Sequence, residues 1–318
     1  MRFYLLALLL LCTTALCAQK KPKKKDTLPD GWRSKGVAEV LFNQAAFNED
    51  WQGGGTSNIA GSFNVNHDLN YKRKKFTWDS RFTAILGITK TKGQKFIRKT
   101  TDRLELNSLA GKKIDSSQWY FSGLFNFRTQ MAPGYTFFER DVLDDAGEVQ
   151  ETVPDRRKVT GTFSPAYVQA GPGILWKQRN DLSINLAPAT ARVIFVNSEF
   201  TKVDTSDPEA VAAYEPFFGV AANDNFRFEL GASVSVYYKD EVFENVVIEN
   251  TLNLYADYLR ETSNVDLDYT LGVAMQVNKY ITTNLALQLI YDDNAIQVLQ
   301  VREILGIGLK YAFFEWKS

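Results

Sequence analysis

The sequence predicts an all-β protein, a transmembrane antiparallel up-and-down β-barrel of about twelve strands, with ten to fourteen as the bounds. The first observation is strict alternation. From Phe226 to Tyr238 the even positions are apolar, whereas most odd positions are polar or small, and ranges 76–88, 265–277 and 281–291 repeat the pattern. Such a period of two indicates strands with one apolar face. Many of these strands exceed the ~9–11 residues that span a bilayer, whereas strands of ordinary sheets have ~5–6.

The connections between the strands supply the second observation. Short and long connections largely alternate, as in barrels with tight periplasmic turns and long outer loops. An even number of strands leaves both termini in the periplasm. The expected strands are 36–44, 55–70, 75–89, 102–113, 118–130, 161–177, 182–196, 225–239, 243–259, 265–278, 281–291 and 303–314. The expected outer loops are 45–54, 90–101, 131–160, 197–224 and 292–302, with a short one near 260–264.

The amino terminus has the order of a secretory signal peptide: Arg2, an apolar stretch from Phe3 to Leu11, then small residues up to Ala18. We expect residues 1–18 to be a cleaved signal, 19–35 a basic disordered leader and 36–318 the barrel. A lipoprotein anchor at Cys17 is the alternative. Export of a barrel predicts the outer membrane of a Gram-negative bacterium.

Composition narrows the chemistry. Both cysteines, Cys12 and Cys17, lie within the predicted signal, so the mature chain has neither disulfides nor a thiol metal site. Acidic and basic residues balance at 37 each, which gives no global field for nucleic acid. The short basic run 20–25 contacts anionic headgroups or, as we favour, is a solvated leader.

The last strand carries Gly308, Tyr311 and Phe313. A glycine followed by two alternate aromatic residues resembles the carboxy-terminal signal that the barrel-assembly machinery reads. We therefore expect that machinery as a partner during biogenesis and outer-membrane lipid as the environment. Aromatic residues near strand ends, such as Tyr71, Phe76 and Tyr280, are typical of the girdles at the two membrane interfaces.

Several motifs resemble a family of outer-membrane proteins of unknown function from Bacteroidetes. They are Trp51 to Gly54, Arg98 to Asp102, Phe125 to Gln130 with Pro133 to Tyr135, Phe163 to Tyr167, and Leu186 to Pro188 with Arg192 to Phe195. The order of the motifs matches along nearly the whole mature chain. Ala187 stands where the family tends to have serine. The resemblance implies the compartment and the fold and brings no activity.

The inward faces of the predicted strands carry many charges. The positions are Asp79, Arg81, Arg103, Glu105, Arg128, Arg227, Glu229, Glu249, Asp257, Asp266 and Asp268. Opposite charges recur on neighbouring strands, with Asp79 and Arg81 beside Arg103 and Glu105. The two interpretations are a polar lumen that selects solutes and a salt-bridge network that fills a closed barrel. We favour the filled barrel, because about twelve strands make a narrower barrel than the open porins of 16–18 strands.

No catalytic, cofactor or metal site is predicted. Serine hydrolysis needs a base in reach, and the single histidine, His67, falls on the lipid-facing side of its strand. Trp51, Gly53 and Gly54 form a loop motif in which the glycines permit a tight turn, and Trp51 is a candidate cap for the outer mouth. Loops 131–160 and 197–224 carry aromatic residues that contact a partner or fold inward as a plug.

These features predict a non-enzymatic outer-membrane component that binds other envelope proteins through its outer loops. A narrow, porin-like channel for small solutes is the alternative, and an outer-membrane enzyme comes third.

Overall fold

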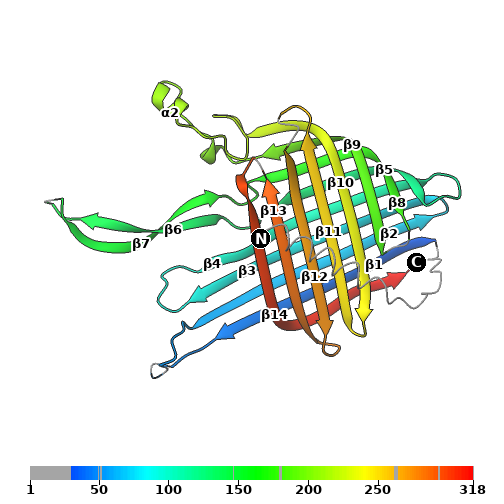
Figure 1. Cartoon of the computed structure of the whole chain (residues 1–318), viewed down its shortest axis with the longest axis horizontal. Coiled ribbons are helices and arrows are strands. Elements are labelled where there is room, and N and C mark those ends of the chain that lie inside the picture. The colour runs from blue at the N-terminus through cyan, green and yellow to red at the C-terminus, as the bar shows by residue number, and fades with distance from the viewer. Residues whose placement is uncertain are drawn as a thin grey trace, which may run out of the picture.

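The chain forms a closed barrel of twelve antiparallel strands in a computed structural model (Figure 1). The structure describes residues 30–318 except 49, 51, 146, 179–180, 261–263, 293 and 318. The prediction of a transmembrane barrel with about twelve strands is confirmed. The predicted signal peptide and residues 19–29 of the predicted leader lie outside the described residues.

The observed strands follow the predicted order. The barrel consists of β1 (Gly31–Ala45), β2 (Asn58–Arg73), β3 (Phe76–Thr91), β4 (Arg98–Lys113), β5 (Trp119–Thr129), β8 (Ala166–Lys177), β9 (Leu182–Phe195), β10 (Phe226–Phe243), β11 (Val246–Asp257), β12 (Val265–Gln276), β13 (Ile281–Asp292) and β14 (Ile296–Lys317). Three boundaries were wrong by five residues or more. The barrel begins at Gly31 instead of residue 36, and β8 begins at Ala166 instead of residue 161. β14 begins at Ile296 instead of residue 303, so the predicted outer loop 292–302 is a short turn.

The strand order is up-and-down, each barrel strand pairing with the next along the chain, and β1 closes the barrel against β14. Gly308 of β14 lies opposite Leu41 at this closing seam. A Cβ atom on Gly308 would lie 2.1 Å from the carbonyl oxygen of Val40. The seam therefore requires glycine at this position.

The predicted outer loop 131–160 contains the largest departure from the prediction. It forms a second, two-stranded sheet of β6 (Gly134–Leu143) and β7 (Val149–Thr160). In Figure 1 this hairpin stands out from the loop end of the barrel, away from the wall. Because β5 and β8 pair directly with each other, the hairpin is an insertion between two neighbouring strands of the barrel.

Outward positions of the barrel are apolar and exposed. Phe63, Phe121, Leu309 and Tyr311 illustrate this face, each more than half exposed. Monomeric soluble proteins rarely expose apolar surface as extensive as this, whereas a lipid-facing barrel surface requires it.

His67 lies on this outward face as predicted. Its Nε2 is 2.8 Å from the hydroxyl of Ser34, and its ring stacks on Phe313 at 6.3 Å. Helical structure in the described residues is confined to the short segments η2 (Ser198–Phe200) and α2 (Pro208–Ala212). None of the described helices is long and apolar enough to cross a membrane.

Candidate functional site

The half of the lumen nearer the loop end holds a cluster of charged side chains around Asp268 of β12. Its carboxylate oxygen Oδ2 lies 2.9 Å from Arg103 Nη1 on β4 and 2.6 Å from Arg128 Nη1 on β5. Arg103 also contacts Glu105 at 2.6 Å, and Gln288 donates to Asp268 Oδ1 at 3.0 Å. Asp268 and Glu105 are both buried. These contacts tie both walls of the barrel to a single carboxylate.

A second cluster lies closer to the turn end, around Arg81 of β3. Its guanidinium contacts Asp68 of the neighbouring β2 at 2.6 Å and Glu249 of β11 at 2.5 Å. It also donates to the hydroxyl of Tyr237 at 2.7 Å, and its Cζ lies 4.4 Å from the centroid of that ring. Lys239 completes the cluster by pairing with Glu249 at 2.6 Å.

Both clusters join opposite walls. In the closed order of twelve strands, β3 and β11 are six strands apart in either direction, and so are β4 and β12. With strands ~4.8 Å apart and tilted by ~40°, a round barrel of this size would be about 24 Å across. An arginine and a carboxylate joined end to end do not reach that far. The barrel is therefore flattened where these side chains meet across it.

A third cluster lies at the loop end. Arg192 of β9 contacts Glu229 of β10 and, at 2.6 Å, Asp266 of β12. Arg227 lies 2.8 Å from Glu229 and 3.6 Å from Asp257. Arg192 and Glu229 are almost completely buried. Buried charges are normally paired in this way, because an isolated one would cost several kcal/mol.

All the charged residues predicted for the lumen take part in ion pairs, although two predicted pairings were wrong. Asp79 contacts Lys177 of β8 at 2.5 Å instead of the cations on β4. Arg81 pairs with Asp68 and Glu249 instead of Glu105. Sequence reasoning missed Asp68, Lys177, Arg192, Lys239 and Arg302 as members of the network. All five occupy inward-facing positions in the alternating pattern of their strands, and this position was the signal available in the sequence.

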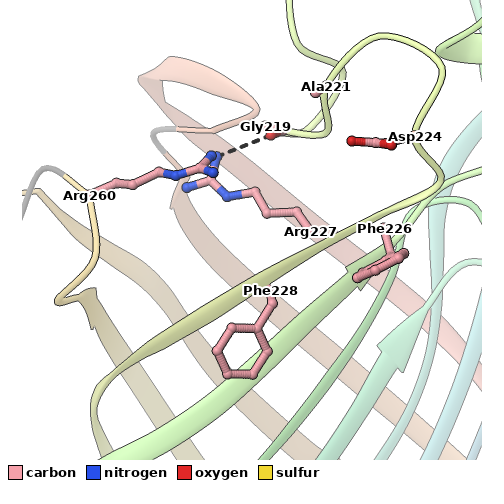
Figure 2. Close-up of a pocket in the computed structure, with 7 residues that line it drawn as sticks. All are labelled: Gly219, Ala221, Asp224, Phe226, Arg227, Phe228 and Arg260. Carbon is pink, nitrogen blue, oxygen red and sulfur yellow. Dashed lines mark hydrogen bonds between the residues drawn. The ribbon is translucent and has the colours of Figure 1, made fainter.

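Residues 196–225, which we term the cap, fold over part of the loop-end mouth. Val220 is fully buried against Tyr167, Ile194 and Val196, and Phe217 and Phe218 pack on the same cluster. Within this loop Phe217 and Phe218 fold inward onto the barrel, whereas α2 is exposed. Figure 2 shows Arg227 and Arg260 converging beneath Gly219, whose carbonyl accepts a hydrogen bond from Arg227 Nη1 at 3.3 Å. Arg227 thus links the loop-end cluster to the cap.

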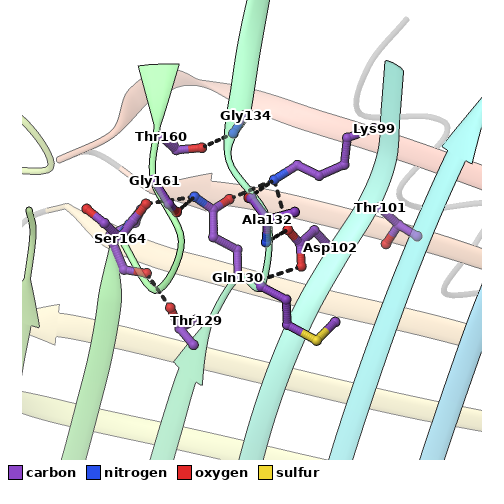
Figure 3. Close-up of polar contacts among 12 residues, drawn as sticks. Lys99, Thr101, Asp102, Thr129, Gln130, Ala132, Gly134, Thr160, Gly161 and Ser164 are labelled. Carbon is purple, nitrogen blue, oxygen red and sulfur yellow. Dashed lines mark hydrogen bonds and ion pairs between the residues drawn. The ribbon is translucent and has the colours of Figure 1, made fainter. Parts of the chain in front are cut away.

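Polar contacts outside the three lumen clusters hold the base of the hairpin (Figure 3). Asp102 accepts hydrogen bonds from the backbone N–H groups of Met131 and Ala132 at 2.7 and 2.8 Å, and Lys99 Nζ contacts Asp102 at 2.9 Å. Gln130 Nε2 donates to the carbonyl oxygens of Gly161 and Ser164. Several residues that carried the family resemblance, such as Lys99, Asp102 and Gln130, therefore meet where the hairpin leaves the barrel.

Aromatic and cationic side chains brace the lower part of the hairpin. The Arg156 guanidinium carbon lies 4.2 Å from the Tyr135 centroid and 4.9 Å from that of Phe96. Lys158 reaches Glu199 of the cap at 2.6 Å. Farther out, the backbone N–H of Arg156 and the guanidinium of Arg140 hold the pKa of Asp155 below its ordinary value. Toward the tip, Leu143 and Val149 are more than half exposed.

The remaining predicted features lie elsewhere. Trp51 is outside the described residues, and its predicted role as a cap is untested. Gly53 and Gly54 lie in the exposed first loop, and Gly54 has a φ of 72°, as a glycine-dependent turn requires. Tyr311 points outward and is 70% exposed. Among the described residues, no group of His, Cys, Asp and Glu side chains could hold a metal ion.

Part of the chain matches the model of a known protein family. Residues 42–135 match the model of a family described as Protein of unknown function (DUF3078). This range contains the first three of the five motif segments named above and less than half of the chain. No curated protein matches the chain.

Solved structures give distant likenesses. The translocator domain of the autotransporter NalP from Neisseria meningitidis has a TM-score of 0.39 and 11% identity, with 91% of this chain and 90% of that chain covered. An outer membrane channel from Pseudomonas putida F1 has a TM-score of 0.37 and 10% identity, covering 92% and 99%. Outer membrane phospholipase A from Escherichia coli has a TM-score of 0.32 and 9% identity, covering 93% and 96%. At this distance the likenesses carry no conclusion about function.

Proposed function

We propose that the chain is a non-enzymatic outer-membrane barrel with an occluded lumen, which anchors the β6–β7 hairpin at the cell surface as a docking arm for other envelope proteins. The observation that carries the proposal is the pairing of opposite walls by Arg81 with Glu249 and by Arg103 with Asp268. If side chains cross the lumen at two levels, solutes do not pass through it, and the function then lies in the hairpin and the cap outside the mouth.

The membrane placement rests on the closed wall and its exposed apolar face. A closed barrel satisfies every strand edge, which is the condition for strands to cross a bilayer. Both termini of the barrel and most of its tight turns lie at one end, which we assign to the periplasm, and the hairpin, the cap and the short β13–β14 turn lie at the other. The glycine and the aromatic residues of β14 suit recognition by the barrel-assembly machinery.

The hairpin suits docking because its base is fixed and its outer part is exposed. Asp102, Gln130 and Arg156 hold the base at defined contacts. The exposed part combines apolar Leu143 and Val149 with acidic residues such as Glu148 and Glu151. Each strand has one partner only, so both outer edges offer backbone groups to an added strand.

The second candidate function is a narrow channel. Its support is the polar inward face, for example Asn66, Asn107 and Asn126, together with the part of the mouth that the cap leaves open. Single-channel recording in planar bilayers separates the two functions. We expect silence from the intact barrel and from a variant in which residues 134–160 are replaced by a short linker. Steady current from the intact protein would overturn the occluded-lumen proposal.

Docking has its own test. A photo-crosslinking residue replaces Leu143 at the hairpin tip, and the matched control carries it at Asp115, an exposed residue in the β4–β5 turn. After irradiation of intact cells, we expect discrete adducts with envelope proteins from position 143 and none of the same size from position 115. Identical patterns from both positions, or no adducts from position 143, would contradict the docking role.

A further inference from the structure

A polar recess opens at the loop end beside the hairpin base. It has a volume of about 320 Å³ and lies between the start of β4 and the β13–β14 wall. Its polar lining includes Thr100, Thr101, Gln130, Gln288, Gln300 and Arg302. The cap covers a different part of the mouth, above β8 to β10, so the recess is separate from the cavity in Figure 2.

Arg302 differs from the other arginines of the lumen clusters. Arg81, Arg103, Arg128, Arg192 and Arg227 each contact a carboxylate. Arg302 instead donates to neutral acceptors, Thr101 Oγ1 and, at 2.7 Å, Gln288 Oε1. Within the described part of the chain, no carboxylate lies within 4.0 Å of it.

The charge count around Arg302 is unbalanced. Among the side chains linked to Asp268, Arg103, Arg128 and Arg302 face two carboxylates, Glu105 and Asp268, so this cluster taken alone has one more cation than carboxylates. The adjoining loop-end cluster has the opposite balance, with three carboxylates and two arginines. Arg302 is half-buried beside the recess and contacts neutral acceptors, and an anion stabilises a partly buried cation of this kind. The lack of a carboxylate partner at Arg302 therefore favours an anion in the recess.

The second cation beside the recess is already neutralised. Lys99 Nζ contacts Asp102 Oδ2 at 2.9 Å, Gln130 Oε1 at 3.1 Å and the carbonyl oxygen of Ala132 at 2.7 Å, which uses its three N–H groups (Figure 3). Arg302 has five N–H groups, of which two donate in the contacts above. Thr101 accepts from Arg302, so its own O–H remains to donate toward the recess.

We propose that this recess binds a small oxyanion of the phosphate class, held by Arg302 and by the hydroxyl of Thr101. The planar guanidinium fork matches oxyanions of this kind. The volume is at the small end of ligand pockets, which suits an inorganic ion or a small phosphate ester. Arg302 and Gln288 face the lumen, so the ion enters from the aqueous side and not from the lipid.

Isothermal titration calorimetry of inorganic phosphate into the folded barrel, in uncharged detergent at low salt, tests the proposal. We expect saturable binding by the wild type and an affinity lower by about tenfold or more for Arg302→Gln, because a charge-assisted hydrogen bond is lost. The matched control is Arg157→Gln, which removes an exposed arginine on β7, and its affinity should equal that of the wild type.

Each variant is first checked for the heat-dependent gel shift of a folded barrel. If Arg302→Gln does not fold, Thr101→Val, which removes one hydroxyl, should still lower the affinity about threefold. Absence of binding to the wild type, or equal affinities for the wild type and the folded recess variant, would overturn the proposal. Competition by phosphatidylglycerol in phosphatidylcholine nanodiscs would also overturn it, because it would assign the anion to the lipid-facing surface.

Discussion

Asp268→Asn tests whether ion pairs hold the two walls of the barrel together. Asp268 is 6% exposed and is shared by Arg103, Arg128 and Gln288, from opposite and adjacent walls. Asparagine preserves the shape and removes the charge. Each charge-assisted hydrogen bond contributes about 1.5–3 kcal/mol, and asparagine still accepts a neutral bond. Breaking a buried ion pair by removing one partner costs about 3–5 kcal/mol.

We therefore expect the free energy of unfolding to fall by about 3–5 kcal/mol, measured by urea titration of the barrel in phospholipid vesicles. The second crossing, Arg81 with Glu249, remains in place, so the single variant should stay silent in planar bilayers. Asp155→Asn is the matched control. Asp155 contacts Arg140 at 2.8 Å on the exposed hairpin, so its loss should leave barrel unfolding and conductance unchanged. Equal unfolding free energies for wild type and Asp268→Asn would refute the claim that this carboxylate holds the walls.

Arg81→Met removes the other cross-lumen contact, to Glu249 at 2.5 Å. Combined with Asp268→Asn it should produce current steps in planar bilayers, whereas Arg157→Met on the hairpin with Asp268→Asn should not. Gly308→Val places side-chain atoms against the Val40 carbonyl oxygen at the closing seam. We expect a lower yield of the heat-shifted, folded form on gels, and a yield equal to wild type would contradict the tight seam. Asp102→Asn weakens the charge-assisted bonds to the Met131 and Ala132 amides, whose hydrogen exchange should accelerate about tenfold. Unchanged exchange would show that the hairpin base is held by other contacts.

The sequence was sufficient for the barrel because its signal is repeated in every strand. Each barrel strand faces lipid on one side and the lumen on the other. Apolar and polar residues therefore alternate through stretches such as 226–238 and 265–277. Boundaries were less certain. At the start of β14 the neighbouring apolar residues Val298 and Leu299 break the alternation, and residues 31–35 are mostly polar or small, so the pattern does not mark these strand starts.

The hairpin escaped prediction for a related reason. A two-stranded sheet in solvent buries neither face, and its sequence consequently lacks a regular period; Phe137 and Phe138 are adjacent, and charges follow them. Its pairing is visible only in the structure.

The charged lumen was predicted residue by residue, whereas its pairing was not. Local reasoning compares neighbouring strands, but Arg81 and Glu249 are 168 residues apart and meet across the barrel. They can meet only because the cross-section of the barrel is flattened. Arg302 shows the same limit, because its lack of a carboxylate follows from what the other strands bring near it.

The flattened section also orders the events of assembly. Arg81 and Arg103 belong to early strands, and their partners Glu249 and Asp268 belong to late ones, so none of these bonds forms while the sheet is an open ribbon with water on both faces. Joining β1 to β14 closes the cylinder, and the ion pairs across it can then draw the two walls together. Maturation therefore has two separable stages, a hydrogen-bonded cylinder followed by a collapse that locks it. The resistance of the mature barrel to denaturants should appear only after the second.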